Sequence, residues 1–322
     1  MSSFGVGRVS SLFVYPMSFD EFLTATGQEG LLRTKRNSSP TNPLPEAFYN
    51  RLVEAFRSYM LVGGMLEAVA TYTETGSYRY SSDIVSEIIQ GYQDDFAKYG
   101  AKANPLLLRQ TLISVAHQAG AKFVYSRVEG QYRSAEVKVA LEMLKDAGLI
   151  IPTYHTDANG VPLGAEINER IVKYLIHDTG VLLGILGIDD DIDDSIKEMM
   201  VADSINLVDK GHVAEMMAGL ELIKYSSPQK RHQLYYWQNM NKGTCAEVDY
   251  VIARSGSIVP IEVKSGVKGS MSSMYSLMRN PQKHIEMGIR CSLENFGTFE
   301  SPDGKKIDII PLYAISNLFA EK

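Results

Sequence analysis

Hydrophobic positions recur at helical spacing through the first third of the chain and at strand spacing nearer its C-terminal end. Apolar residues three or four apart predict helices over residues 46–60, 67–72 and 82–99. Ser18 precedes a further helical pattern whose first turn is acidic, which is typical of a capped helix N-terminus. A polar, proline-rich loop over residues 33–45 separates this helix from the next. We therefore expect a helical N-terminal part.

The middle of the chain, residues 104–155, predicts a helix, a turn, a second helix and a short strand. The second helix runs from Ala135 to Ala147 with Ser134 as its N-cap, and Gly148 ends it. A turn over residues 157–160 follows the strand and forms a candidate wing. This order of elements resembles a winged helix.

Two interpretations of the second helix differ in function. In a DNA-reading winged helix it enters the major groove, where outward Arg, Lys, Asn or Gln side chains read the bases. Its polar residues here are nearly balanced in charge: Glu136, Lys138, Glu142, Lys145 and Asp146. The balance favours a structural winged helix over a DNA reader.

The remaining pattern alternates strands and helices. We expect strands over residues 170–177, 234–238 and 307–316, and helices over residues 211–224 and 271–291. Asp178 precedes another helical segment, so a helix N-cap is its expected role, and a catalytic role is the alternative.

The segment EVDYVIARSGSIVPIEVKS, residues 247–265, predicts a β-hairpin around a turn over residues 254–257. Side chains alternate along a strand, so Glu262 and Lys264 share one face. Glu247 and Asp249 share a face of the preceding strand. Charges beside apolar strands are costly unless they are paired or hold a metal ion.

An Asp followed by Glu-x-Lys on the next strand resembles the PD-(D/E)xK nuclease superfamily, the fold of restriction endonucleases. The resemblance implies that Asp249 and Glu262 hold a divalent ion, Mg²⁺ or Mn²⁺, and that Lys264 positions or activates the attacking water. It also implies that Glu215, on the helix before the hairpin, supplies an extra acid. The competing interpretations are a cross-face ion pair for the hairpin and an ordinary exposed helix glutamate for Glu215.

A second resemblance covers nearly the whole chain. The segment GRVSSLFVYPMSFDEFL, ending at Leu23, together with YMLVGGMLEAV at residues 59–69 and YQDDFAK at residues 92–98, resembles a bacterial and archaeal AAA-type ATPase family with a C-terminal domain of unknown function. Leu66 departs from the proline that the family carries there. In the C-terminal domain the family has a K-x-Y…D-x-G pattern, which here contains Lys173 and Asp178.

The nucleotide-binding half of that family has no counterpart in this sequence. The chain contains no G-x-x-x-x-G-K-[ST] loop, whose backbone amides, lysine and hydroxyl cradle a triphosphate and its magnesium ion. We therefore expect no ATP site in this chain and no ATPase activity by the chain alone.

These observations predict a multi-domain α/β protein. The expected parts are a helical, ATPase-lid-like region over residues 1–103, a winged-helix-like domain over residues 104–165, and a restriction-endonuclease-like domain with a mixed sheet over residues 166–322.

Composition and charge limit the cellular compartment and the binding partners that we expect for this protein. The net charge of −6 provides no global basic field for nucleic acid, so any DNA surface has to be local. Cys245 and Cys291 make neither a disulfide framework nor a zinc site by their spacing. The apolar run near residues 181–188 is too short to cross a bilayer. We expect a cytoplasmic protein with no membrane partner.

Two functions are compatible with the sequence. The first is a metal-dependent nuclease that acts on DNA phosphodiesters. The second is a non-catalytic interaction or regulatory module with a nuclease-like fold, whose partners are other protein subunits.

Overall fold

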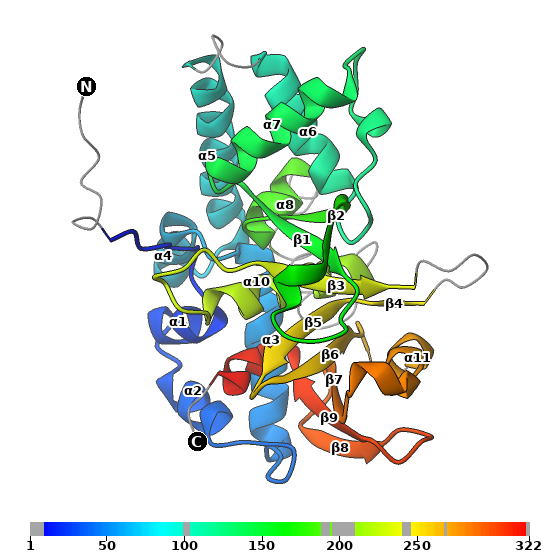
Figure 1. Ribbon diagram of the computed structural model, residues 1–322. Coiled ribbons are helices and arrows are strands. Elements are labelled where there is room, and N and C mark those ends of the chain that lie inside the picture. Colours follow the sequence, from blue (N-terminus) through cyan, green and yellow to red (C-terminus); the bar gives the residue numbers. More distant parts are fainter. Residues whose placement is uncertain are drawn as a thin grey trace.

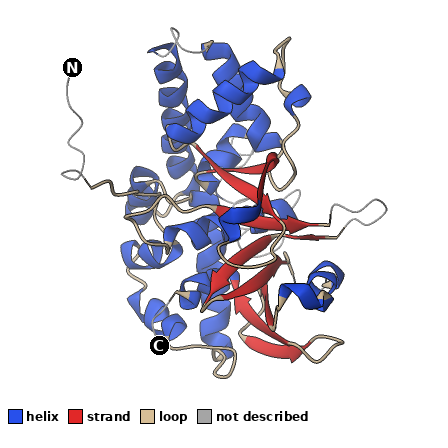
Figure 2. Cartoon of the chain, in the orientation of Figure 1, coloured by secondary structure: helices blue, strands red, loops and turns tan. Residues whose placement is uncertain are grey.

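The computed structural model describes residues 10–98, 104–187, 194, 210–239, 246–266 and 269–319. Helices make up the N-terminal part, and mixed sheets dominate the C-terminal part. In Figure 2 most of the N-terminal helices lie along the left side, and the strands occupy the centre and right. The general prediction of a mixed α/β protein is confirmed.

The helical part begins at the predicted cap. The Ser18 hydroxyl accepts from the Glu21 N–H, and the Glu21 carboxylate accepts from the Ser18 N–H, which closes a capping box. The helices of this part are α1 (Phe19–Ala25), α2 (Glu29–Arg36), α3 (Glu46–Val62), α4 (Leu66–Thr75) and α5 (Tyr78–Lys98). Their apolar faces pack inward, as the helical periodicity predicts.

The middle segment contains the predicted helix–turn–helix–strand order. Its elements are α6 (Pro105–His117), η1 (Tyr125–Arg127), α7 (Ser134–Asp146) and β1 (Ile150–Thr156). α7 begins at Ser134, one residue earlier than predicted, so Arg133 occupies the N-cap position.

The first sheet joins the middle segment to later parts of the chain. Its strand order is β2-β1-β3-β4, with β2 (Ile167–Ile176), β3 (Leu234–Gln238) and β4 (Glu247–Val248). β1 is antiparallel to β2 and parallel to β3, so this sheet crosses the predicted boundary between residues 165 and 166. Three further elements flank it: η2 (Leu163–Glu166), α8 (Thr179–Ile185) and α10 (Lys210–Lys224).

The second sheet has the strand order β5-β6-β7-β9-β8 and lies below the first in Figure 1. Its strands are β5 (Tyr250–Arg254), β6 (Ser257–Val263), β7 (Met287–Ser292), β8 (Gly297–Glu300) and β9 (Lys306–Pro311). β6, β7 and β9 run parallel, and the two edge strands are antiparallel to their neighbours. The other elements are α11 (Ser272–Arg279), η3 (Pro281–Lys283) and η4 (Leu312–Leu318).

The prediction of one helix over residues 271–291 is wrong. α11 ends at Arg279 because Asn280 precedes a proline and takes an extended conformation. Residues 287–292 then form β7, which pairs with β6 on one side and β9 on the other. The predicted closing strand over residues 307–316 is also too long, since η4 begins at Leu312.

A continuous hydrophobic core runs from Phe19 in α1 to Leu318 in η4 and includes residues of both sheets. A smaller cluster lies under α11, around Met274 and Leu277. The N-terminal helices therefore share one core with the strands that carry the candidate site.

Candidate functional site

The predicted hairpin is formed by β5 and β6. Tyr250 pairs with Ile261, and Arg254 pairs with Ser257. Ser255 and Gly256 have φ values of 50° and 77°, as a two-residue type I′ turn requires. This tight turn sets the register that brings the end of β6 opposite the residue before β5.

Asp249 is that residue, located between β4 and β5. Its Oδ2 accepts a hydrogen bond of 2.7 Å from the Val263 N–H, so the carboxylate is held against the end of β6. Burial raises the pKa of Asp249, and the Glu247 carboxylate adds to this effect. The Val263 N–H and the charges of Lys173 and Lys264 oppose it.

Glu262 and Lys264 share one face of the strand end, and their side chains meet. Lys264 Nζ donates to Glu262 Oε1 at 2.7 Å. Glu262 is only 5% exposed, and its second oxygen, Oε2, has no hydrogen-bond partner among the described residues. Burial and the neighbouring Asp249 charge raise the pKa of Glu262 to about 7.

Glu215 reaches the same place from α10. Gly219 lets this helix approach β5 closely, because a Cβ there would lie 2.4 Å from the Tyr250 hydroxyl oxygen. The Tyr250 hydroxyl donates to the Glu215 carbonyl oxygen at 2.8 Å. Burial raises the pKa of Glu215 to about 8; the Lys173 charge opposes the rise and the Asp249 charge adds to it.

Sequence reasoning did not assign a site role to Lys173 or Glu247. The Lys173 Nζ lies 2.8 Å from Glu215 Oε1 and 2.5 Å from Glu247 Oε1, and 4.9 Å from the centre of the Tyr236 ring. A lone lysine within the apolar, buried second half of β2 was the available signal for Lys173. The available sequence signal for Glu247 was that it shares a strand face with Asp249.

We call this group the acid cluster: the carboxylates of Glu215, Glu247, Asp249 and Glu262 with the ammonium groups of Lys173 and Lys264. All four residues predicted for the site belong to it. Among the described residues, no three or more His, Cys, Asp or Glu side chains are grouped so that they could hold a metal ion. The Mg²⁺ or Mn²⁺ ion therefore stays a prediction.

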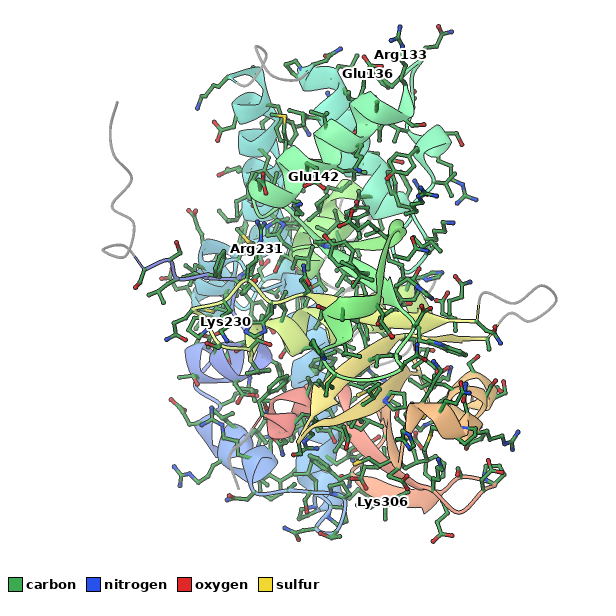
Figure 3. All side chains as sticks on the ribbon, viewed as in Figure 1. Arg133, Glu136, Glu142, Lys230, Arg231 and Lys306 are labelled. Carbon is green, nitrogen blue, oxygen red and sulfur yellow. The ribbon has the colours of Figure 1, made fainter. Side chains whose placement is uncertain are left out.

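The charged side chains of α7 are three carboxylates and two lysines, and several of them make local contacts. Glu136 and Glu142 project from this helix in Figure 3, with Arg133 directly before it. The Arg133 N–H donates to Glu136 Oε2 at 2.8 Å, and Glu142 forms an ion pair with Lys145. This face offers DNA no excess of positive charge, in line with the balanced composition.

Asp178 has the predicted capping role. Its Oδ1 accepts from the Val181 N–H at the start of α8, and its Oδ2 accepts from the Gly64 N–H at 2.6 Å. Of the two cysteines, Cys291 is a buried free thiol in β7, and Cys245 lies outside the described residues. None of the described helices is long and apolar enough to cross a membrane.

Two family models match parts of the chain. Residues 53–192 match a domain of unknown function, DUF8612, and residues 210–315 match another, DUF4143, which is often found with AAA ATPases. No curated protein and no solved structure shows a significant match. Lys173 lies within the first matched region and the rest of the acid cluster within the second, so the cluster is assembled from both.

Proposed function

We propose that the chain is a divalent-cation-dependent nuclease that hydrolyses DNA phosphodiester bonds at the acid cluster. Asp249 and Glu262 are the proposed ligands of one Mg²⁺ or Mn²⁺ ion. Lys264 is the proposed partner of the attacking water, and Glu215 is the assisting acid.

The observation that carries this proposal is that Glu262 Oε2 has no hydrogen-bond partner among the residues that the structure describes. A buried carboxylate oxygen without a hydrogen-bond partner is costly, and most buried polar atoms in proteins are satisfied. The Asp249 carboxylate adds like charge beside it. Hard divalent cations prefer oxygen ligands, so the two carboxylates fit Mg²⁺ or Mn²⁺.

The bound ion would polarise the phosphodiester and lower the pKa of a water molecule. The residues of the chain supply the remaining functions. The Val263 N–H orients Asp249, and Glu262 holds the partly exposed Lys264 ammonium where it can meet a phosphate oxygen or a water. Glu215, with a pKa near 8, can carry a proton at neutral pH.

The order of elements supports a restriction-endonuclease-like domain. α10 precedes the strands β3 to β6, and α11 with the parallel strand β7 follows them. We further propose that α6, α7 and β1 form a structural winged helix. Fold alone does not establish activity, so the site has to be tested directly.

The test is a cleavage assay with Mn²⁺ on supercoiled, linear and single-stranded DNA. We expect the wild type to cut at least one form, and Asp249→Ala to abolish cutting. Glu300→Gln, an exposed carboxylate change on β8, is the matched control and should cut like the wild type. Absence of cutting by the wild type on every form contradicts the proposal.

A second candidate, a non-catalytic interaction module, rests on a different observation. Lys173 and Lys264 already neutralise part of the carboxylate charge from within the chain. In a non-catalytic module, the ion pairs of the acid cluster would serve to hold β2, α10 and the hairpin against one another. Asp249→Ala would then destabilise the fold. Added Mn²⁺ would leave the melting temperatures of both the wild type and Asp249→Ala unchanged.

A further inference from the structure

The Lys173 ammonium occupies the position between two carboxylates of the acid cluster. It lies 2.8 Å from Glu215 Oε1 and 2.5 Å from Glu247 Oε1. The carboxylates come from α10 and β4, and the lysine comes from the middle of β2. Two segments, α10 and β4, therefore each place a carboxylate against the single ammonium group that β2 supplies.

Lys173 is too deeply buried to contact a DNA strand. It is 1% exposed, pairs with Thr153 across β1 and β2, and lies over the Tyr236 ring. Burial lowers the pKa of Lys173, but the charges of Glu215 and Glu247 outweigh this and raise it. The two carboxylates therefore favour the charged ammonium form of Lys173.

With all its acids ionised, the acid cluster has an excess of two negative charges, because four carboxylates face two ammonium groups. One bound divalent ion would favour that ionised form and neutralise its excess charge. Lys264 and Glu262 belong to the hairpin side of the cluster, with Asp249, and within the described part of the chain Glu262 Oε2 has no hydrogen-bond partner. Lys173 neutralises the other side, between Glu215 and Glu247.

We propose that Lys173 takes the place of a second cation and thereby limits the acid cluster to one divalent ion. This inference rests on the proposed metal site at Asp249 and Glu262. Without the ammonium, Glu215 and Glu247 would present two carboxylates to each other, and such a pair binds a hard cation.

The experiment compares manganese stoichiometry in the wild type and Lys173→Met, measured by titration calorimetry and by the electron paramagnetic resonance signal of free Mn²⁺. We expect one bound ion per chain in the wild type and two in Lys173→Met. The double variant Lys173→Met/Glu247→Gln should return to one ion, because it removes a ligand of the second ion. Lys224→Met changes a buried lysine outside the cluster and should keep one ion.

The outcomes separate this inference from the metal site itself. If the wild type binds no Mn²⁺, both the metal site and the role of Lys173 are wrong. If the wild type and Lys173→Met both bind one ion, only the inference about Lys173 is wrong.

A folding failure of Lys173→Met leaves a second test. Glu247→Gln in the otherwise unchanged chain keeps Lys173, and we expect it to retain one bound Mn²⁺. Loss of the bound Mn²⁺ in Glu247→Gln would show that Glu247 is a ligand of the ion at Asp249 and Glu262. That result would overturn the proposal that Lys173 takes the place of a second cation.

Discussion

Two groups of buried charge in this protein differ in how completely their hydrogen bonds are satisfied. The first is the acid cluster. The second, which we call the core network, joins α1, α3 and α10 through Tyr59, Glu221 and Lys224, with the Met17 carbonyl and the Phe19 N–H.

Both carboxylate oxygens of Glu221 in the core network are bonded. Oε2 accepts from the Phe19 N–H at 3.2 Å, and Oε1 accepts from the Tyr59 hydroxyl at 2.8 Å. Lys224 Nζ donates to Tyr59 Oη at 2.6 Å and lies 3.6 Å from Glu221 Oε1. In the acid cluster, by contrast, Glu262 keeps one oxygen without a partner among the described residues, and burial raises the pKa values of three carboxyl groups.

The comparison indicates different purposes for the two groups. Buried polar groups that are fully bonded stabilise and specify a fold. Buried carboxylates with raised pKa values and an unused oxygen cost stability, and such groups are concentrated at functional sites.

Removing the central carboxylate of the core network should destabilise the protein strongly. We expect Glu221→Ala to lower the free energy of unfolding by about 3–5 kcal/mol, because it leaves the buried Lys224 charge without its partner. Urea unfolding measures the change. The exposed substitution Glu300→Ala should stay within about 0.5 kcal/mol of the wild type. The Mn²⁺-induced stabilisation of Glu221→Ala should equal that of the wild type, and its loss would show that the two groups are not independent.

Removing a carboxylate of the acid cluster should instead remove the response to metal. At a free Mn²⁺ concentration of a hundred times its Kd, the wild type should gain about 2.7 kcal/mol, and Asp249→Ala should gain nothing. Thermal melts with and without Mn²⁺ measure this. Asp146→Ala, an exposed carboxylate change on α7, is the matched control. Equal shifts in wild type and Asp249→Ala would remove Asp249 from the metal site.

The raised pKa of Glu262 predicts a pH dependence of stability in the absence of divalent ions. Its folded-state value of about 7 lies above the ordinary 4.5, so the folded chain favours the protonated carboxyl group. The stabilisation is complete below about pH 4.5 and is lost as the pH rises through about 7.

Glu262→Gln replaces the carboxyl group with an amide that does not ionise. Comparing this variant with the wild type therefore isolates the contribution of Glu262 to the pH dependence of stability. Between pH 5 and pH 8 the wild type should lose roughly 1–3 kcal/mol more stability than Glu262→Gln. Urea unfolding in the presence of a chelator measures both proteins. Parallel pH profiles would show that Glu262 ionises as readily in the folded chain as in the unfolded one.

The smallest expected effect concerns α1, one of the three helices that the core network joins. Ser18→Ala removes the hydroxyl that caps α1 and should cost about 1 kcal/mol, measured by urea unfolding. Ser18→Thr keeps a capping oxygen and should recover most of the loss. An unchanged stability in Ser18→Ala would mean that the Glu21 half of the capping box is sufficient.

The sequence predicted those features whose causes lie within a few residues. The N-cap at Ser18, the N-cap at Asp178 and the turn over residues 254–257 all depend on neighbouring backbone and side-chain atoms. The shared face of Glu262 and Lys264 follows from strand periodicity alone. The helix predicted over residues 271–291 is wrong because its second half is paired on both sides by distant strands.

Lys173 illustrates what only the tertiary structure decided. It lies 42 residues from Glu215 and 74 residues from Glu247, and no local pattern connects the three. Strand pairing brings β2 beside β1, and the close packing of α10 on β5 brings Glu215 to the hairpin. The sequence by itself determined the hairpin and its charged face, since backbone geometry repeats every two residues. Long-range packing decided how deeply those charges are buried and how they are paired. It also decided that Glu262 Oε2 has no hydrogen-bond partner among the described residues. Packing has these effects because it sets the local dielectric environment and the distances between charges.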